Sequence, residues 1–175
     1  VPGGNEKMFA KALGLDADGL ILDLEDAVPP DRKVATRPII REWLAKGDFG
    51  GRERWVRMNP IATRLGHEYL EETIAGRPDG YVVPKPRAAG DIREIAQLLD
   101  GLEHRHGIPN GATRLVLIAT ETPEGLLNIR EVAAASPRVV AISWGVEDLS
   151  AALVLPQTRD AEGRYLDIPR YARTM

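Results

Sequence analysis

Charged residues stand at, or just after, the end of five hydrophobic, strand-like segments of this chain. The segments with their charged ends span residues 20–26, 55–59, 81–85, 115–121 and 139–148. Helix-like sequence separates them, so consecutive strands are expected to lie parallel in one sheet, and right-handed crossovers then bring their carboxyl ends to the same edge. The positions of the charges therefore predict one shared site at that edge.

Six residues at these strand ends are candidates for chemistry: Glu25, Asp26, Arg57, Lys85, Glu121 and Asp148. Because side chains alternate along a strand, Glu25, Arg57, Lys85 and Glu121 form a consistent inward set. With Asp26 and Asp148 included, four carboxylates meet two cations in one cavity. Such a group repels itself unless a further positive charge lies within it, and a divalent metal ion would supply that charge.

The residue types favour Mg²⁺ or Mn²⁺ over Zn²⁺. Carboxylate oxygens are available, cysteine is absent, and the three histidines all fall on helix-like segments. We expect Glu121 and Asp148 to be the metal ligands, because each ends a strand and precedes a helix-starting sequence. Two structural alternatives stay open: Asp148 could cap the helix that begins at Leu149, and Glu121 could pair with Arg114 or Arg130.

Arg57 and Lys85 are the two candidate cations. Arg57 has the fork geometry that binds a substrate carboxylate through two parallel hydrogen bonds, although pairing with Glu25 or Asp26 is an equally simple interpretation. Lys85 lies between Pro84 and Pro86, and we expect these prolines to hold it in a stiff extended segment. It could form a Schiff base, but the excess of carboxylates favours a role as their counter-ion.

Composition narrows the class of protein. The 175 residues can bury a substantial core and are most simply one domain, residues 1–175. A net charge of −3 without a basic run argues against nucleic acid as a partner. No apolar stretch approaches the roughly 20 residues of a membrane span, and no signal pattern or disulfide framework is present, so we expect a cytoplasmic protein.

The sequence between the strands predicts helices. We expect helices over 5–13, 31–46, 63–75, 91–106 and 123–135, with Pro38 breaking or kinking the second. Both an open doubly wound sheet and a (β/α)₈ barrel fit this alternation, and charge at every strand end favours the barrel. The chain opens as though just after a strand and stops in a helix-like segment, so part of the fold is expected to be missing.

The motifs resemble those of the HpcH/HpaI aldolase and citrate lyase beta-subunit superfamily, in particular its CitE-like branch of CoA-ester lyases. Six matching segments occur in order, over essentially the whole chain: 1–3, 21–28, 56–59, 83–85, 121–122 and 144–149. The resemblance implies a TIM-like (β/α)₈ barrel, here without its first strand and its last two strands. It also implies Mg²⁺ on Glu121 and Asp148, with Arg57 holding the carboxylate of an oxo acid or of the acyl-CoA ester.

The resemblance also implies a reaction. Free pyruvate-aldehyde aldolases of the superfamily carry a histidine where this chain reads Asp23 to Ala27, and its absence points to lyases that cleave or form a 3-hydroxyacyl-CoA such as citryl-, malyl- or citramalyl-CoA. Three alternative hypotheses for the function stay open: a metal-dependent aldolase of free 2-oxo acids, a malyl-CoA thioesterase, and a non-catalytic subunit that works beside an acyl carrier partner. The segment 153–156 lacks the glycine that relatives have there.

In relatives the catalytic base is a carboxylate of a neighbouring subunit, beyond the sixth strand. By resemblance we therefore expect a homo-oligomer, a trimer or hexamer, with the base outside this segment. Glu25 and Asp26 are the alternative bases within the chain.

Overall fold

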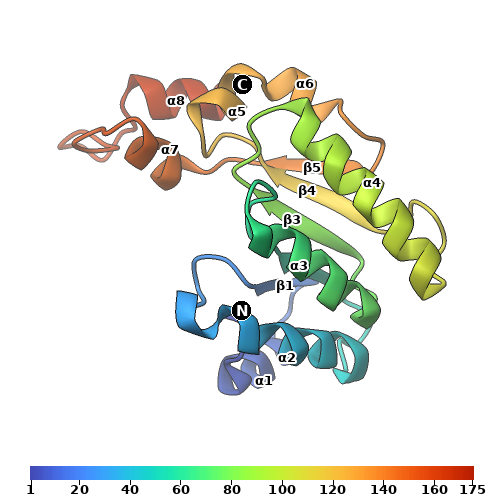
Figure 1. Ribbon diagram of the computed structural model, residues 1–175. Helices are drawn as coiled ribbons and strands as arrows, with labels where there is room; N and C mark the ends of the chain where they lie inside the picture. Colours follow the sequence, from blue (N-terminus) through green and yellow to red (C-terminus); the bar gives the residue numbers. More distant parts are fainter.

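The computed structural model describes residues 1–175 and contains one five-stranded parallel sheet (Figure 1). The strands pair in the order in which they occur along the chain. They are β1 (Gly19–Asp23), β2 (Glu53–Arg57), β3 (Gly80–Pro84), β4 (Arg114–Ile118) and β5 (Val139–Ser143). A doubly wound sheet reverses its strand order at a switch point, and this sheet does not. The prediction of a barrel-type sheet is therefore confirmed.

Eight α-helices and two short 3₁₀ turns connect and follow the strands. The helices are α1 (Glu6–Leu13), α2 (Lys33–Lys46), α3 (Arg64–Thr73), α4 (Ala89–His106), α5 (Pro123–Leu127), α6 (Ile129–Ala133), α7 (Val146–Ala152) and α8 (Asp167–Thr174), and the turns are η1 (Pro30–Arg32) and η2 (Ile74–Gly76). Neighbouring helices α2, α3 and α4 contact one another along one side of the sheet (Figure 1). No helix has the length and apolar character that a bilayer crossing requires.

The core lies between the sheet and this helix layer. Alternate strand residues such as Leu22, Val83 and Leu117 are fully buried against apolar residues of the helices. The other face of the sheet is partly open, and Ile21 on it is 46% exposed. One covered face and one open face are what part of a barrel wall presents, because the barrel interior is filled only when the wall closes.

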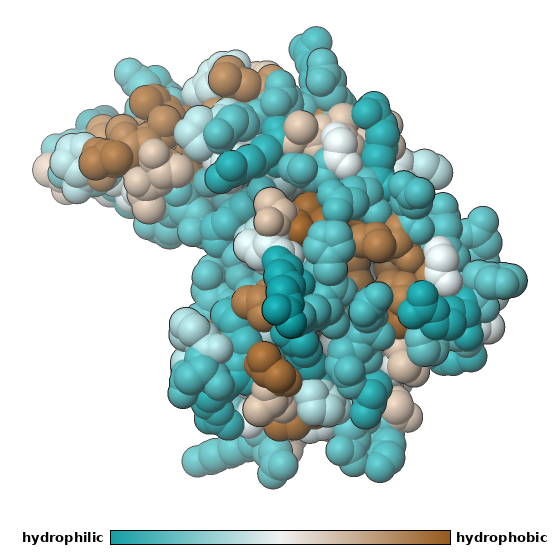
Figure 2. Space-filling model, in the orientation of Figure 1, coloured by the Kyte–Doolittle hydropathy of each residue, from teal (hydrophilic) through white to brown (hydrophobic).

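The outer surface is hydrophilic over most of the face that Figure 2 shows, with hydrophobic atoms visible where α3 and α4 meet. A groove of about 410 Å³ lies there, and Leu70, Leu98 and Leu102 are among the residues that line it. His67 lies on its rim with Nε2 3.2 Å from Glu94. The groove is in the helix layer and not at the carboxyl edge of the strands.

Several helix ends follow the sequence signals. The side chain of Asn5 accepts a hydrogen bond from the N–H of Met8 at the start of α1, and Gly107 ends α4 in the left-handed conformation. Two expectations differ from the structure. Of the break or kink expected at Pro38, the break does not occur: α2 is continuous, and the buried residues Thr36 and Ile40 on either side of the proline anchor it. The expected helix over 123–135 is two short helices that meet at Asn128, whose side chain donates to the carbonyl of Arg87.

The first residues pair with the sheet. Pro2 forms a parallel bridge with Asp23, and the backbone N–H groups of Gly3 and Asp23 donate to the carbonyls of Asp23 and Val1. The segment 1–3 thus runs beside β1 on the side away from β2.

Candidate functional site

Arg57, the last residue of β2, lies among carboxylates that follow β1. Its Nε and Nη2 donate to the two carboxylate oxygens of Asp23, over 2.9 and 2.6 Å. Its Nη1 lies 3.2 Å from Oε2 of Glu25 and 3.7 Å from Oδ2 of Asp26. The hydrogen bonds to Asp23 raise the pKa of Arg57 further, so its charge is fixed. The fork edge of the guanidinium is therefore occupied by Asp23, a partner that the strand-end pattern did not identify.

Glu25 is the buried carboxylate of the site. Its side chain is only 4% exposed, against 58% for Asp26. Burial raises the pKa of Glu25, and the hydrogen bond from Lys85 opposes that rise. Oε2 of Glu25 is buried and accepts no hydrogen bond, although Arg57 is near it. Glu25 is thus held by charge on one oxygen and by a hydrogen bond on the other.

Lys85 lies at the centre of the carboxylates. Its ammonium donates to Oε1 of Glu25 over 2.6 Å and lies 3.4 Å from Oδ1 of Asp148 and 3.7 Å from Oδ2 of Asp26. Burial alone would lower the pKa of Lys85, but the hydrogen bond to Glu25 and the surrounding negative charges outweigh it and raise the pKa. A lysine held in the charged form is a counter-ion and a poor Schiff-base nucleophile.

Glu121 and Asp148 both contact Lys85, one through its backbone and the other through its ammonium. Oε2 of Glu121 accepts a hydrogen bond from the backbone N–H of Lys85, over 2.8 Å. Burial, with added repulsion from Glu25 and Asp148, raises the pKa of Glu121 to about 7. Asp148 lies in the first turn of α7, whose N-cap is Gly145, so Asp148 is not the capping residue. Arg114, one of the alternative partners of Glu121, pairs with Glu53 instead.

Sequence reasoning missed three polar residues beside this group: Asp23, Lys33 and Asn59. Asp23 faces Arg57 because those two residues pair in the β1–β2 register, which the sequence pattern does not encode. Lys33 begins α2 and is not at a strand end. Its ammonium reaches Oδ1 of Asn59 over 2.9 Å. Asn59 stands in the same strand-end motif as Arg57, which is the one signal that could have found it.

The arrangement offers the carboxylate oxygens that Mg²⁺ prefers. Five carboxylates, those of Asp23, Glu25, Asp26, Glu121 and Asp148, gather with three cations, Lys33, Arg57 and Lys85. No group of three or more His, Asp or Glu side chains is arranged to hold a metal ion by itself. Mg²⁺ commonly takes one or two carboxylates and completes its shell with water and substrate. Glu121 and Asp148 fit that pattern, because Glu121 is buried among negative charges that a cation would relieve.

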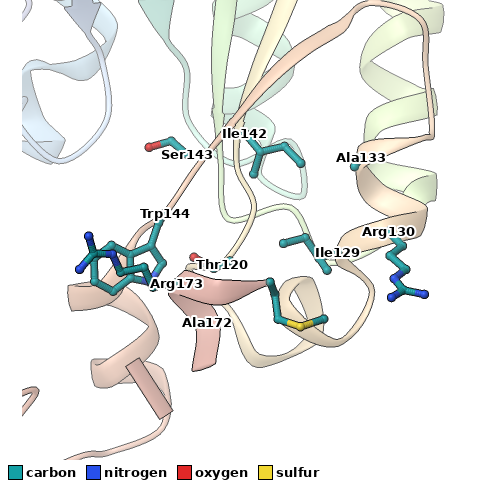
Figure 3. Close-up of a pocket in the computed structure, with 10 residues that line it drawn as sticks. Thr120, Ile129, Arg130, Ala133, Ile142, Ser143, Trp144, Ala172 and Arg173 are labelled. Atoms are coloured by element: carbon teal, nitrogen blue, oxygen red, sulfur yellow. The ribbon is translucent and has the colours of Figure 1, made fainter. Parts of the chain in front are cut away.

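A cavity of about 350 Å³ lies between β5, α6 and α8 (Figure 3). Ile129 and Ala133 of α6, Ile142 of β5 and Ala172 of α8 are among its lining residues, and Arg173 lies 5.7 Å from the ring centre of Trp144. None of the six predicted site residues lines this cavity. The charged cluster is at the carboxyl edge of the strands, where chemistry on a barrel is expected.

Comparison with known proteins places the chain in a family. The model of the HpcH/HpaI aldolase/citrate lyase family matches residues 1–174. A (3S)-malyl-CoA thioesterase of Cereibacter sphaeroides is 35% identical over 153 residues, which are 87% of this chain and 49% of the relative. A malyl-CoA/beta-methylmalyl-CoA/citramalyl-CoA lyase of Chloroflexus aurantiacus is 35% identical over 149 residues, 83% of this chain and 42% of the relative.

Solved structures agree with these matches. The citrate lyase beta subunit from M. tuberculosis, complexed with oxaloacetate and magnesium, has a TM-score of 0.76 and 31% identity, over 99% of this chain and 68% of that one. The chain spans about half the length of the curated relatives it matches. Matching motifs, fold and family model lead to one conclusion: the chain belongs to the HpcH/HpaI aldolase/citrate lyase family.

Proposed function

We propose that the protein is a Mg²⁺-dependent carbon–carbon lyase that cleaves or forms a 3-hydroxyacyl-CoA thioester such as malyl-, citramalyl- or citryl-CoA. The observation that carries this proposal is a group of charged side chains at the carboxyl edge of the sheet. In it Glu121 and Asp148 contact Lys85, and Arg57 shares the carboxylates of Glu25 and Asp26 with Lys85. The names of the relatives support it, since they include malyl-CoA and citramalyl-CoA lyases.

Glu121 and Asp148 would hold the Mg²⁺ ion. When bound, the ion supplies Lewis-acid polarisation of the hydroxyl or ketone oxygen and of the adjacent carboxylate. Mn²⁺ suits the same oxygen donors. Lys85 contributes by fixing both ligands, because its N–H binds Glu121 and its ammonium lies against Asp148.

Arg57 would bind the carboxylate of the oxo acid or of the acyl group. Its Nε and Nη2 protons that face Asp23 are occupied, so the substrate would use the Nη1–Nη2 end of the guanidinium, beside Glu25 and Asp26, which lie near Nη1. Asp23 then orients that end. This assignment replaces the expectation that the whole fork is available to substrate.

Cleavage moves one proton and breaks one bond. The C3 hydroxyl gives up its proton and becomes the carbonyl of the oxo acid, the C2–C3 bond breaks, and C2 gains a proton as the shortened CoA ester leaves. We assign the proton transfer to a carboxylate of a neighbouring subunit in a homo-oligomer. Asp26 is the alternative within this chain, because it is exposed and Glu25 is already bound to Lys85. An acyl carrier partner in place of free CoA would use the same site.

A malyl-CoA thioesterase is the second candidate, since relatives with 35% identity carry that name. The two reactions are distinguished by their products. A lyase converts malyl-CoA to acetyl-CoA and glyoxylate, whereas a thioesterase yields free CoA and malate.

The test uses full-length protein and a panel of malyl-, citramalyl- and citryl-CoA, with Mg²⁺ and after its removal by EDTA. We expect cleavage of at least one ester, loss of cleavage with EDTA and recovery when Mg²⁺ is returned. Asp148→Asn should lower Mg²⁺ affinity measured by calorimetry, while Asp167→Asn, at an exposed position of α8, should not. Undiminished activity in EDTA, or equal affinity in the two variants, would reject the metal assignment.

A further inference from the structure

Lys33 connects the loops that follow β1 and β2. Its ammonium donates to the carbonyls of Leu24 and Glu25, over 3.0 and 2.7 Å, and to Oδ1 of Asn59, over 2.9 Å. An ammonium has three protons, and here three acceptors receive them. The position of Nζ is therefore fully determined by groups on two different loops.

Asn59 completes the connection. Its Nδ2 donates to the carbonyl of Leu24 over 2.8 Å, so that this carbonyl receives bonds from both Lys33 and Asn59. Asn59 is buried, and Lys33 is half-buried at the beginning of α2. The backbone carbonyl of Lys33 in turn accepts from the hydroxyl of Tyr69 in α3. Helix α2 is thereby joined to the chain at residues 24 and 25.

These bonds fix the backbone from which the Glu25 side chain extends to Lys85. The backbone of residues 24 and 25 makes only a few other hydrogen bonds: Leu24 donates to the carbonyl of Arg57, and Glu25 donates to Asp23. Loss of Lys33 would leave the carbonyl of Glu25 with one bond, from Val28 over 3.1 Å. Glu25 must be held within a narrow range to keep its contact with Lys85, because catalytic groups tolerate little displacement.

We propose that Lys33, acting through Asn59 and the backbone of Leu24 and Glu25, is a positioning residue of the proposed lyase site. It touches neither substrate nor metal in this assignment. Its effect passes from Lys33 to Glu25 and from Glu25 to Lys85, which contacts both proposed metal ligands. The effect of Lys33 on catalysis rests on the proposed function. Its effect on the order of residues 24–28 does not depend on that function.

The experiment compares Lys33→Met with Lys46→Met in the full-length protein. Both lysines lie on α2, and Lys46 is exposed at its far end, paired with Glu42. Methionine keeps the apolar stem and removes the three donors. Hydrogen exchange read by mass spectrometry on peptides covering residues 24–28 should be faster in Lys33→Met alone. With the CoA ester that the protein cleaves best, kcat should fall at least tenfold while KM changes less than threefold.

A second variant tests the proposal if Lys33→Met does not fold. Asn59→Ala keeps Lys33 and removes its side-chain acceptor, and it should accelerate exchange in the same peptides and lower kcat in the same direction. Exchange that matches Lys46→Met, or a kcat within twofold of it, overturns the proposal. If the unaltered protein cleaves none of the esters, the proposed function fails, and the exchange measurement alone then decides whether Lys33 orders residues 24–28.

Discussion

The backbone N–H of Lys85 donates to Oε2 of Glu121 over 2.8 Å from a left-handed conformation, with φ of 52°. A residue with a Cβ rarely adopts that conformation, and when it does so at a functional site the surrounding structure must hold it there. At Lys85 the backbone hydrogen bond to Glu121 and the ion pair with Glu25, whose Oε1 lies 2.6 Å from the ammonium, both contribute to that hold. The backbone and side chain of one residue thus connect the two buried glutamates of the site.

Lys85→Met should separate these two roles. The N–H bond to Glu121 stays, but Glu25 loses its hydrogen-bonded counter-ion while its side chain is 4% exposed. Breaking one side of a buried pair costs about 3 kcal/mol, so unfolding in urea at pH 7 should shift by an amount of that order. Adding Glu25→Gln should restore most of the stability but not the CoA-ester cleavage, because glutamine needs no counter-ion. Lys7→Met on the exposed face of α1 is the control. Equal unfolding of Lys85→Met and the control would show that the pair does not stabilise the fold.

Gly145→Ala should displace Glu121. A Cβ at residue 145 would lie 2.3 Å from Cγ of Glu121 and 2.9 Å from Cγ2 of Ile118, closer than real contacts allow. If Glu121 binds Mg²⁺ as proposed, calorimetry should show an affinity reduced about 10- to 100-fold, the range seen when the surroundings of a ligand are altered. Gly101→Ala has open space around its Cβ and should leave affinity unchanged. Unaltered affinity in Gly145→Ala would remove Glu121 from the ligand set.

The sequence predicted the strand ends and most helix ends, because those depend on local signals. Alternation correctly placed Arg57 and Lys85 with the carboxylates, but it could not show that Asp23 takes the fork of Arg57. That pairing depends on the β1–β2 register, in which Asp23 stands opposite Arg57. Lys33 was missed for a related reason: its role depends on how α2 begins against the β1 loop, which is a tertiary contact.

A second charged network lies at the opposite edge of the sheet. Glu103, near the end of α4, is fully buried and accepts hydrogen bonds from the backbone N–H groups of Gly111 and Thr113 and from Arg138. Burial would raise the pKa of Glu103, but these bonds outweigh it and lower the pKa to about 2. This is the amino-terminal edge of β4 and β5, where barrel residues serve stability.

Acid unfolding should therefore depend on Glu103. A carboxylate whose pKa is lower in the folded state stabilises the fold above its ordinary pKa of 4.5, and the effect is lost as the pH falls toward about 2. Lowering the pKa of Glu103 from 4.5 to about 2 corresponds to a contribution on the order of 3 kcal/mol to the free energy of unfolding. Glu103→Gln should accordingly unfold more easily than the unaltered protein at pH 7, and the difference should shrink between pH 4.5 and pH 2. Glu131→Gln, at an exposed position of α6, is the control. A difference that stays constant with pH would contradict this account.

Val154 occupies a position that normally belongs to glycine. After α7, the N–H of Val154 donates to the carbonyl of Ala151 and the N–H of Leu155 donates to that of Ser150, which is the hydrogen-bond pattern of a Schellman motif. Val154 has φ of 54° and is 86% exposed. The resemblance predicts a glycine in this segment. The turn forms without it, but a β-branched residue in the left-handed region is strained.

Val154→Gly should therefore stabilise the protein. The left-handed conformation costs a residue with a Cβ about 1 to 2 kcal/mol, and little burial is lost at so exposed a site. Allowing for the greater freedom of glycine in the unfolded chain, we expect a net gain of about 1 kcal/mol. Urea unfolding of the full-length protein measures it, and Val154→Ala should give a smaller gain, because alanine keeps the Cβ and loses only the branching. Because Val154 makes none of the contacts of the carboxylate cluster, the cleavage rate should stay unchanged. A Val154→Gly variant less stable than Val154→Ala would mean that this residue does not hold the left-handed conformation in solution.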